Sequence, residues 1–146
     1  MNYENTHPTG QLPWYVRTTL AVFGIGLIGM LVIAMCLTPS AKGYGTHTQM
    51  GLKPCSFTAL VGIRCPSCGM TTSWAHYVRG NWVKSVQSNT GGMLLAMSAT
   101  LAGPWMLVSG LLGRWWLWHP NEWIIVAVAV VIVIVTLCDW GYRLSY

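Results

Sequence analysis

Charged residues are scarce in this sequence, and acidic residues are nearly missing. Of 146 residues, eight are Lys or Arg and three are Asp or Glu, so 8% are charged, against about a quarter in a soluble domain. This composition excludes a water-soluble globule and a disordered chain. The few acids form no carboxylate pair, and no Ser-His-Asp set or phosphate loop can be assembled. The sequence therefore favours a protein that is not an enzyme.

Apolar residues make up 53% of the chain, and nine of its residues are Trp. About 20 apolar residues of helix cross the hydrocarbon layer of a membrane, and the stretches 18–37, 91–112 and 123–140 fit this length. We predict an all-α integral membrane protein with three transmembrane helices, in which residues 1–146 form a single domain. We expect the lipid bilayer to be its main partner. The basic residues are scattered, so nucleic acid is not an expected partner.

The segment between the first two spans, residues 38–90, carries five basic residues and no acid. Basic residues near spans are retained in the cytoplasm, so we expect the N-terminus outside and segment 38–90 inside. Whatever the orientation, three crossings place the end of the first span, segment 38–90 and the end of the third span on one side. All five cysteines lie in these parts of the chain, so they should share one face of the membrane.

Segment 38–90 also has a helical pattern of apolar residues. A single stripe would contain Met70, Trp74, Tyr77 and Val78, and a second short helix would cover 82–88. We predict two amphipathic helices that lie flat at the membrane surface, with their Trp rings in lipid. The basic side chains of Arg79 and Lys84 would then meet lipid phosphates.

The run Cys65-Pro66-Ser67-Cys68-Gly69 has the form of a metal-binding turn. Two residues between the thiols let both sulfurs reach one ion, and Gly69 suits the positive φ of a tight turn. A structural zinc needs four ligands, so Cys55 is a candidate third ligand and His76 or His47 a candidate fourth. Three alternatives stay open: a disulfide from Cys55 to one of the other two cysteines, thiol redox chemistry, or a turn without a metal.

The second span has one face of small residues at helical spacing, formed by Gly92, Ala96, Ala99, Gly103 and Gly110. Such a face lets another helix approach closely. The other helix can belong to the same chain, to a second copy or to a partner subunit. No span has a charge at its centre, which disfavours a transporter or proton pump.

The cysteine-containing part of segment 38–90 resembles a known protein family. Cys55, the Cys65–Thr71 run, the Gly80 helix end and Asn89 resemble a bacterial family of small multi-span membrane proteins of unknown function. Its members have a Cys, a spacer, CPxCG followed by Leu or Met and Thr, and an Asn before the next span. Thr72 departs from the pattern, since the family usually has Arg there. The resemblance implies a bacterial cytoplasmic membrane location and no activity.

Taken together, the sequence favours a structural or accessory subunit of a membrane assembly, or a homo-oligomer, with a surface segment stapled by cysteines. The first alternative is a metal-binding or thiol-redox membrane protein, with structural zinc as the candidate cofactor. The second alternative is an oligomeric pore around the second span.

Overall fold

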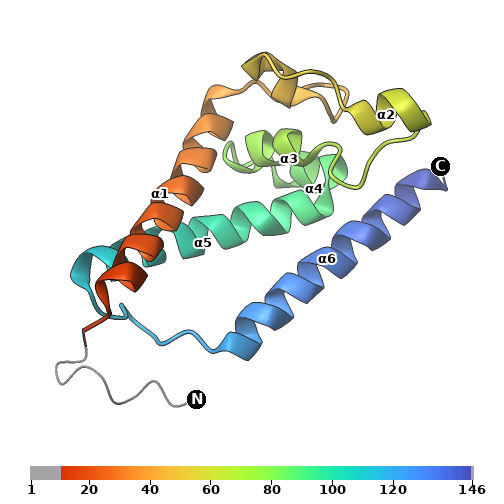
Figure 1. The fold of residues 1–146 in the computed structure, drawn as a ribbon. Coiled ribbons are helices and arrows are strands. Elements are labelled where there is room, and N and C mark those ends of the chain that lie inside the picture. The colour runs from red at the N-terminus through yellow and green to blue at the C-terminus, as the bar shows by residue number, and fades with distance from the viewer. Residues whose placement is uncertain (1–10, 146) are drawn as a thin grey trace.

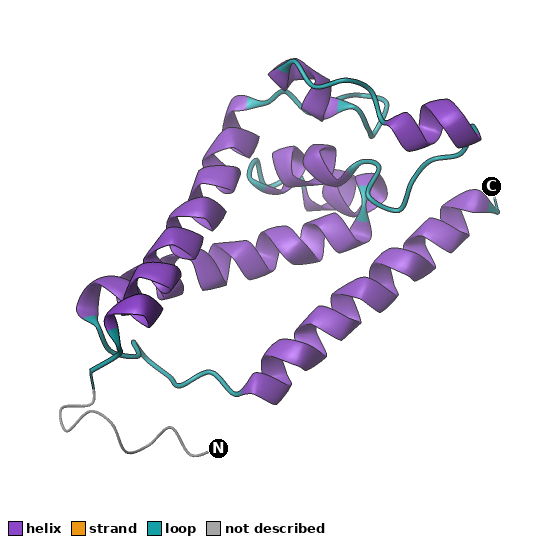
Figure 2. Cartoon of the chain, in the orientation of Figure 1, coloured by secondary structure: helices purple, strands orange, loops and turns teal. Residues whose placement is uncertain are grey.

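The computed structural model describes residues 11–145, and every regular element within them is a helix (Figure 2). In chain order these elements are α1 (Trp14–Cys36), the 3-10 helix η1 (Thr46–Met50), α2 (Ser56–Val61), α3 (Met70–Tyr77), α4 (Trp82–Ser88), α5 (Thr90–Leu112) and α6 (Glu122–Leu144). The all-α fold predicted from the sequence is confirmed.

Three helices are long and apolar enough to cross a membrane, as the sequence predicts. Helices α1, α5 and α6 have 23 residues each, with a mean hydropathy of 2.5, 1.5 and 2.6 in their most apolar stretches, and a helix of that length extends about 35 Å. The outer bounds differ from the prediction, because α1 begins at Trp14 and α6 continues to Leu144. Both extensions contain an Arg, whose long side chain can leave the apolar layer.

Helices α1 and α5 pack against each other through very close backbone contacts. A Cβ on Gly24 would lie 2.6 Å from the backbone nitrogen of Leu107 and 2.9 Å from the Gly103 carbonyl oxygen. At the other end of the contact, a Cβ on Gly110 would lie 2.7 Å from the Arg17 carbonyl oxygen. Only glycine permits such an approach, so this contact fixes how the two helices cross.

The small-residue face of α5 is buried inside the chain. Gly103 faces Leu27 and Ile28 of α1, whereas Gly92 faces Met70 and Ser73 of α3. All five predicted residues are buried: Gly92, Ala96, Ala99, Gly103 and Gly110. The chain's own helices therefore occupy this face, which leaves it closed to a second copy or a partner.

Helix α3 contacts both α1 and α5, and α4 packs against α3 and α5 (Figure 1). Trp74 of α3 is 7% exposed and forms the core with Ala34, Ala96 and Ala99. Here the structure differs from the expected flat placement, because the Trp74 ring contacts protein instead of lipid. Lipid and a protein core are both apolar, so the same helical stripe suits either surrounding.

Two arginines bind the C-terminal carbonyls of helices. Arg79 donates from Nη1 to the Ala34 carbonyl at 3.2 Å and from Nη2 to the Met35 carbonyl at 2.8 Å, at the end of α1. Arg17 donates to two carbonyls in the last turn of α5, each at 3.4 Å. These carbonyls have no partner within their own helices, and a cation there also complements the helix dipole. Arg79 is also exposed, so the expectation that it meets lipid phosphates stays a prediction.

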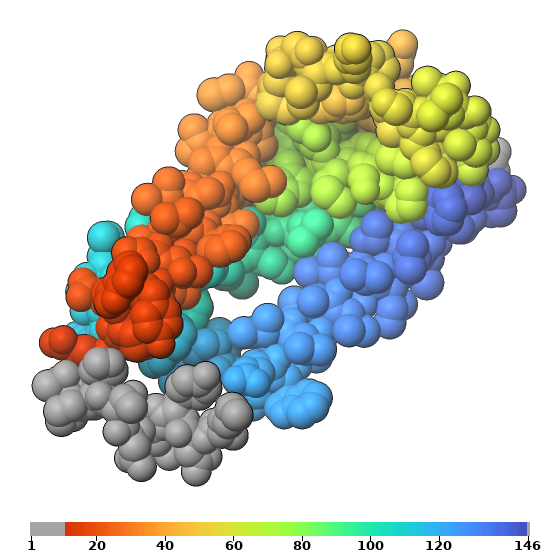
Figure 3. All heavy atoms as spheres, in the orientation of Figure 1, coloured from red at the N-terminus to blue at the C-terminus, as the bar shows by residue number. Residues whose placement is uncertain are grey.

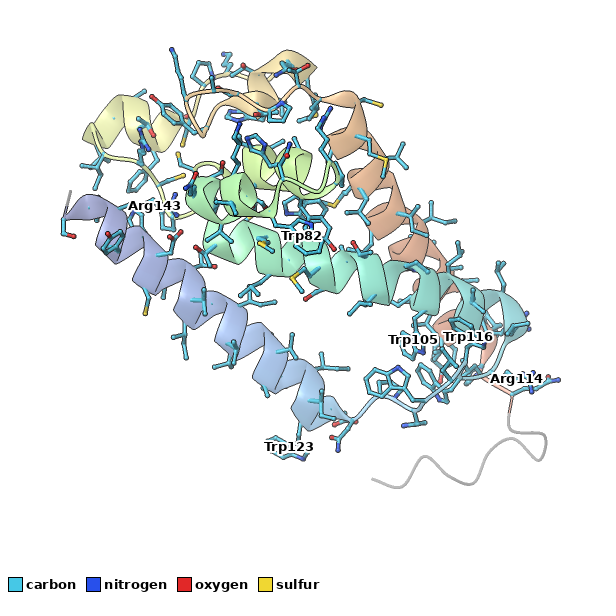
Figure 4. The ribbon with its side chains drawn as sticks, turned by 180° about the vertical axis from the view of Figure 1, so that it is seen from behind. Trp82, Trp105, Arg114, Trp116, Trp123 and Arg143 are labelled. Carbon is cyan, nitrogen blue, oxygen red and sulfur yellow. The ribbon has the colours of Figure 1, made fainter. Side chains whose placement is uncertain are left out.

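Helix α6 contacts the rest of the molecule mainly near its C-terminal end. None of its residues is buried, and Figure 3 shows an open gap between its first half and helices α1 and α5. The C-terminal ends of α1 and α6 lie at the same end of the molecule as α2 and α3 (Figure 1). Figure 4 shows Arg143 at this end, and Trp105, Arg114, Trp116 and Trp123 at the other.

Candidate metal centre

Three thiols from segment 38–90 meet at one point. The Sγ atoms of Cys65 and Cys68 are 3.1 Å apart, and those of Cys55 and Cys65 are 3.6 Å apart. All three sulfurs lie within 4.8 Å of one another, and none is in a disulfide. Zinc–thiolate bonds of about 2.3 Å in a tetrahedron hold sulfurs about 3.8 Å apart. The donor set and its spacing therefore fit a single soft metal ion.

The turn that carries Cys65 and Cys68 has a backbone that only glycine can complete. Gly69 has a φ of +90°, as the sequence predicts. A Cβ on Gly69 would also collide with the Ser88 carbonyl oxygen and lie 2.7 Å from the Gly43 carbonyl oxygen. Inside the turn, the Cys68 N–H donates to the Cys65 carbonyl at 3.0 Å. The side chains of Cys65 and Cys68 thus extend from a turn that packs against the backbone of both Ser88 and Gly43.

Asn89 anchors this turn to the start of α5. Its side chain is fully buried, and Nδ2 donates to the carbonyls of Pro66 at 3.0 Å and of Cys68 at 3.2 Å. Its Oδ1 accepts from the Gly92 N–H at 2.7 Å and so caps α5. One amide group therefore couples a transmembrane helix to the backbone beside two candidate ligands.

Helix α6 anchors the same turn from the other side. Arg143 donates from Nη1 to the Cys68 carbonyl at 3.1 Å, and its guanidinium pairs with Asp139 at 2.5 Å. Trp140 donates from Nε1 to the Arg64 carbonyl at 2.6 Å, next to Cys65. No pattern in the sequence indicates that Arg143 or Trp140 contacts the cysteine turn.

The thiols of Cys55 and Cys65 differ in acidity. The Thr58 backbone N–H, together with the Cys65 thiol, lowers the pKa of Cys55 to about 7. Burial, and then the hydrogen bond with Cys68, raises the pKa of Cys65 to about 12. At neutral pH the metal-free cluster thus holds partial thiolate character at Cys55 and a neutral thiol at Cys65. Full ionisation of the cluster requires a cation between the sulfurs.

The two histidines considered as a fourth ligand are placed differently. His47, from η1, lines the same cavity as the three thiols, although neither of its ring nitrogens lies within 4.8 Å of all three sulfurs. His76 does not line this cavity. Burial, followed by the charges of Lys84 and Arg79, lowers the pKa of His76. Within residues 11–145 the structure therefore brings three of the four proposed ligands together.

The remaining side of the cluster is open. A cavity of about 710 Å³ adjoins the three thiols and is also lined by Lys42, His47 and the first turn of α3. A metal held by three sulfurs would therefore have room for water or another small ligand at a fourth position, which is the arrangement of zinc sites that bind exchangeable ligands.

A family of known proteins matches part of the chain. A family described as "Protein of unknown function (DUF2752)" matches residues 55–103, which include the three thiols, Asn89 and the first half of α5. No curated protein and no solved structure matches the chain. The match thus supports a link between the cysteine segment and a family of unknown function, and it assigns no activity to this chain.

Proposed function

We propose that this membrane protein binds a soft metal ion, with Zn²⁺ as the reference case, through Cys55, Cys65 and Cys68. The observation that carries the proposal is the convergence of these three thiols within 4.8 Å at one end of the three spans. The metal would staple segment 38–90 to the transmembrane helices.

A staple is physically useful in this segment. Helix α2 has six residues, none of them buried, and a helix that short is unstable without support. Cys55 precedes α2, whereas Cys65 and Cys68 belong to the anchored turn before α3. An ion shared by the three would close the α2 loop and hold it against the rest of the protein.

Metal content of the purified protein tests this proposal. We expect about one zinc ion per chain by elemental analysis. Replacing Cys65 and Cys68 together by Ser should abolish binding and leave membrane insertion intact, because neither residue lies in a transmembrane helix. Replacing Cys36 and Cys138 by Ser is the matched control, because both are exposed and outside the cluster. That variant should keep its zinc.

Two results would refute the metal site. One is a zinc content that stays the same when Cys65 and Cys68 are replaced. The other is a mass lower than that of the free-thiol chain by two hydrogen atoms, which would reveal a disulfide and favour the thiol-redox alternative. Free thiols that bind no added zinc, copper or cobalt would equally exclude the proposal.

A role as a structural or accessory subunit is the second candidate. It is favoured by α6, which has no buried residue and whose first half is separated from α1 and α5 by an open gap (Figure 3). If the purified protein stayed monomeric in mild detergent at all concentrations, and no membrane protein copurified with it, this role would fail. A pore around α5 is less well supported, because the small face of that helix already contacts α1 and α3.

A further inference from the structure

Helix α6 is held to the rest of the protein next to the thiol cluster. Trp140 donates from Nε1 to the Arg64 carbonyl at 2.6 Å, so it binds the peptide group that joins Arg64 to Cys65. Arg143 donates from Nη1 to the Cys68 carbonyl at 3.1 Å. Two side chains of α6 thus bind backbone carbonyls before and after the two cysteines of the turn.

A further contact of α6 lies at the start of α5. The Thr90 N–H donates to Asp139 Oδ2 at 3.3 Å, and Thr136 packs against Gly91. The preceding residue, Asn89, itself holds the cysteine turn through its side-chain amide. This contact is therefore also adjacent to the candidate ligands.

The rest of α6 adds little that would hold it in place. None of its residues is buried, and an open gap separates its first half from α1 and α5 (Figure 3). In a bilayer, lipid covers an apolar helix as well as another helix would, so the apolar surface of α6 gives it no strong preference for the protein. The polar contacts beside the cysteine turn therefore determine how firmly α6 docks.

The carbonyl that Trp140 binds belongs to a part of the chain that a metal would order. Arg64 lies between α2 and the cysteine turn, and α2 is a six-residue helix with no buried residue. An ion shared by Cys55 and Cys65 would close this loop and limit the motion of the Arg64 peptide group. Trp140 would then bind an acceptor that is already fixed, so docking of α6 would cost less conformational entropy.

We infer that metal binding at the thiol cluster is linked to docking of the C-terminal end of α6, so that the metal controls how firmly the third transmembrane helix is held. This linkage rests on the proposed metal site. Linkage is reciprocal, so the docked helix strengthens metal binding by the same factor by which the metal strengthens docking. Loss of the metal would thereby change the position of a helix that faces the bilayer.

The zinc affinity of a Trp140 variant tests the linkage from the side of the metal. Trp140→Phe keeps an aromatic ring and removes the donor to the Arg64 carbonyl. We expect it to lower zinc affinity about fivefold in competition with a chelator, as the loss of one hydrogen bond would give. Trp123→Phe is the matched control, because Trp123 is 80% exposed at the other end of the same helix. That variant should bind zinc as the native chain does.

A double variant enlarges the effect. Arg143→Lys keeps a positive charge beside Asp139 and removes the guanidinium that binds the Cys68 carbonyl. Combined with Trp140→Phe, it should lower zinc affinity roughly ten- to hundredfold, because both supports of the turn from α6 are then lost.

The position of α6 tests the linkage from the other side. Cys36 at the end of α1 and Cys138 in α6 are exposed and outside the cluster. In the full-length, zinc-loaded protein, thioether-linked spin labels are attached to these two residues while zinc protects the other three thiols. We expect the distribution of distances between the labels to become at least twice as broad when a chelator removes the zinc. In the double variant it should be broad with and without zinc.

The two arms separate this linkage from the metal site itself. A chain that binds no zinc would refute both. Zinc that binds the native chain and the double variant with equal affinity would overturn the linkage and leave the metal site intact. An unchanged distance distribution after zinc removal would do the same, because α6 would then dock independently of the metal.

Discussion

At the scale of single residues, the Asn89 side chain supports both the start of α5 and the cysteine turn. Its amide group caps α5 and also holds the carbonyls of Pro66 and Cys68. Asn89→Ala would remove the cap and leave the Pro66 carbonyl without its partner, whereas the Cys68 carbonyl would keep its hydrogen bond from Arg143. We expect a loss of about 3 kcal/mol of unfolding free energy, together with a roughly ten- to hundredfold loss of zinc affinity. Thermal unfolding in detergent and zinc titration measure the two effects.

Asn121 provides the control for that variant. It caps α6 by accepting from the Trp123 N–H at 3.0 Å, and it lies on the exposed surface away from the thiols. Asn121→Ala should cost about 1 kcal/mol and leave zinc affinity unchanged. If both variants lowered zinc affinity equally, the role of Asn89 in positioning the turn would be refuted.

Gly69 gives a second test at the same scale. Gly69→Ala would force an L residue into a positive φ and would bring its Cβ within 2.7 Å of two backbone oxygens. Gly62 also has a positive φ, but a Cβ there would meet nothing within 4 Å. Gly62→Ala should therefore cost only about 1 kcal/mol of backbone strain. A stability loss several times larger in Gly69→Ala is the expected result, and equal losses would contradict the tight packing of the turn.

Among the elements, the crossing of α1 and α5 depends on Gly24. Gly24→Ala should lower the unfolding free energy by about 1–3 kcal/mol, because its Cβ would collide with backbone atoms of α5. Gly26 lies on the same helix with nothing within 4 Å of its Cβ position, so Gly26→Ala should be neutral or slightly stabilising. Detergent unfolding of the two variants compares them directly. A more stable Gly24→Ala protein would mean that the helices do not cross there.

The elements also show what the sequence could predict. The long charge-free runs identify the three transmembrane helices, because few other structures tolerate them. The ends of α1 and α6 were missed, because Arg17 and Arg143 lie within the helices and reach backbone carbonyls elsewhere. The placement of α3 was missed as well, because its stripe of apolar residues fits lipid and protein equally.

For the candidate site, the sequence indicated the ligands but not their supports. The spacing of Cys65 and Cys68 makes them a pair, and Cys55 is near in the sequence. The supports come from Asn89, Trp140 and Arg143, and the contact of Trp140 joins residues 76 positions apart. No local pattern reports a contact of that kind. The sequence contains two local signals for these supports: an Asn that precedes the second predicted span, and an Arg that follows the third.

At the scale of the whole molecule, three membrane crossings determine on which side each loop lies. In a background with the five native cysteines replaced by Ser, we consider single cysteines at the exposed residues Lys42, Arg114 and Ser145. An impermeant maleimide should label Lys42→Cys and Ser145→Cys from the same side, and Arg114→Cys from the other. The distribution of basic residues predicts that Arg114 is outside. Labelling of Lys42→Cys and Ser145→Cys from opposite sides would contradict three crossings.

The thiol cluster itself is tested most directly by X-ray absorption at the zinc edge of the zinc-loaded, full-length protein. We expect about three sulfur neighbours near 2.3 Å and about one lighter neighbour, oxygen or nitrogen, near 2.0 Å. A zinc ion surrounded only by oxygen and nitrogen, or one with a single sulfur neighbour, would show that Cys55, Cys65 and Cys68 do not hold the metal together.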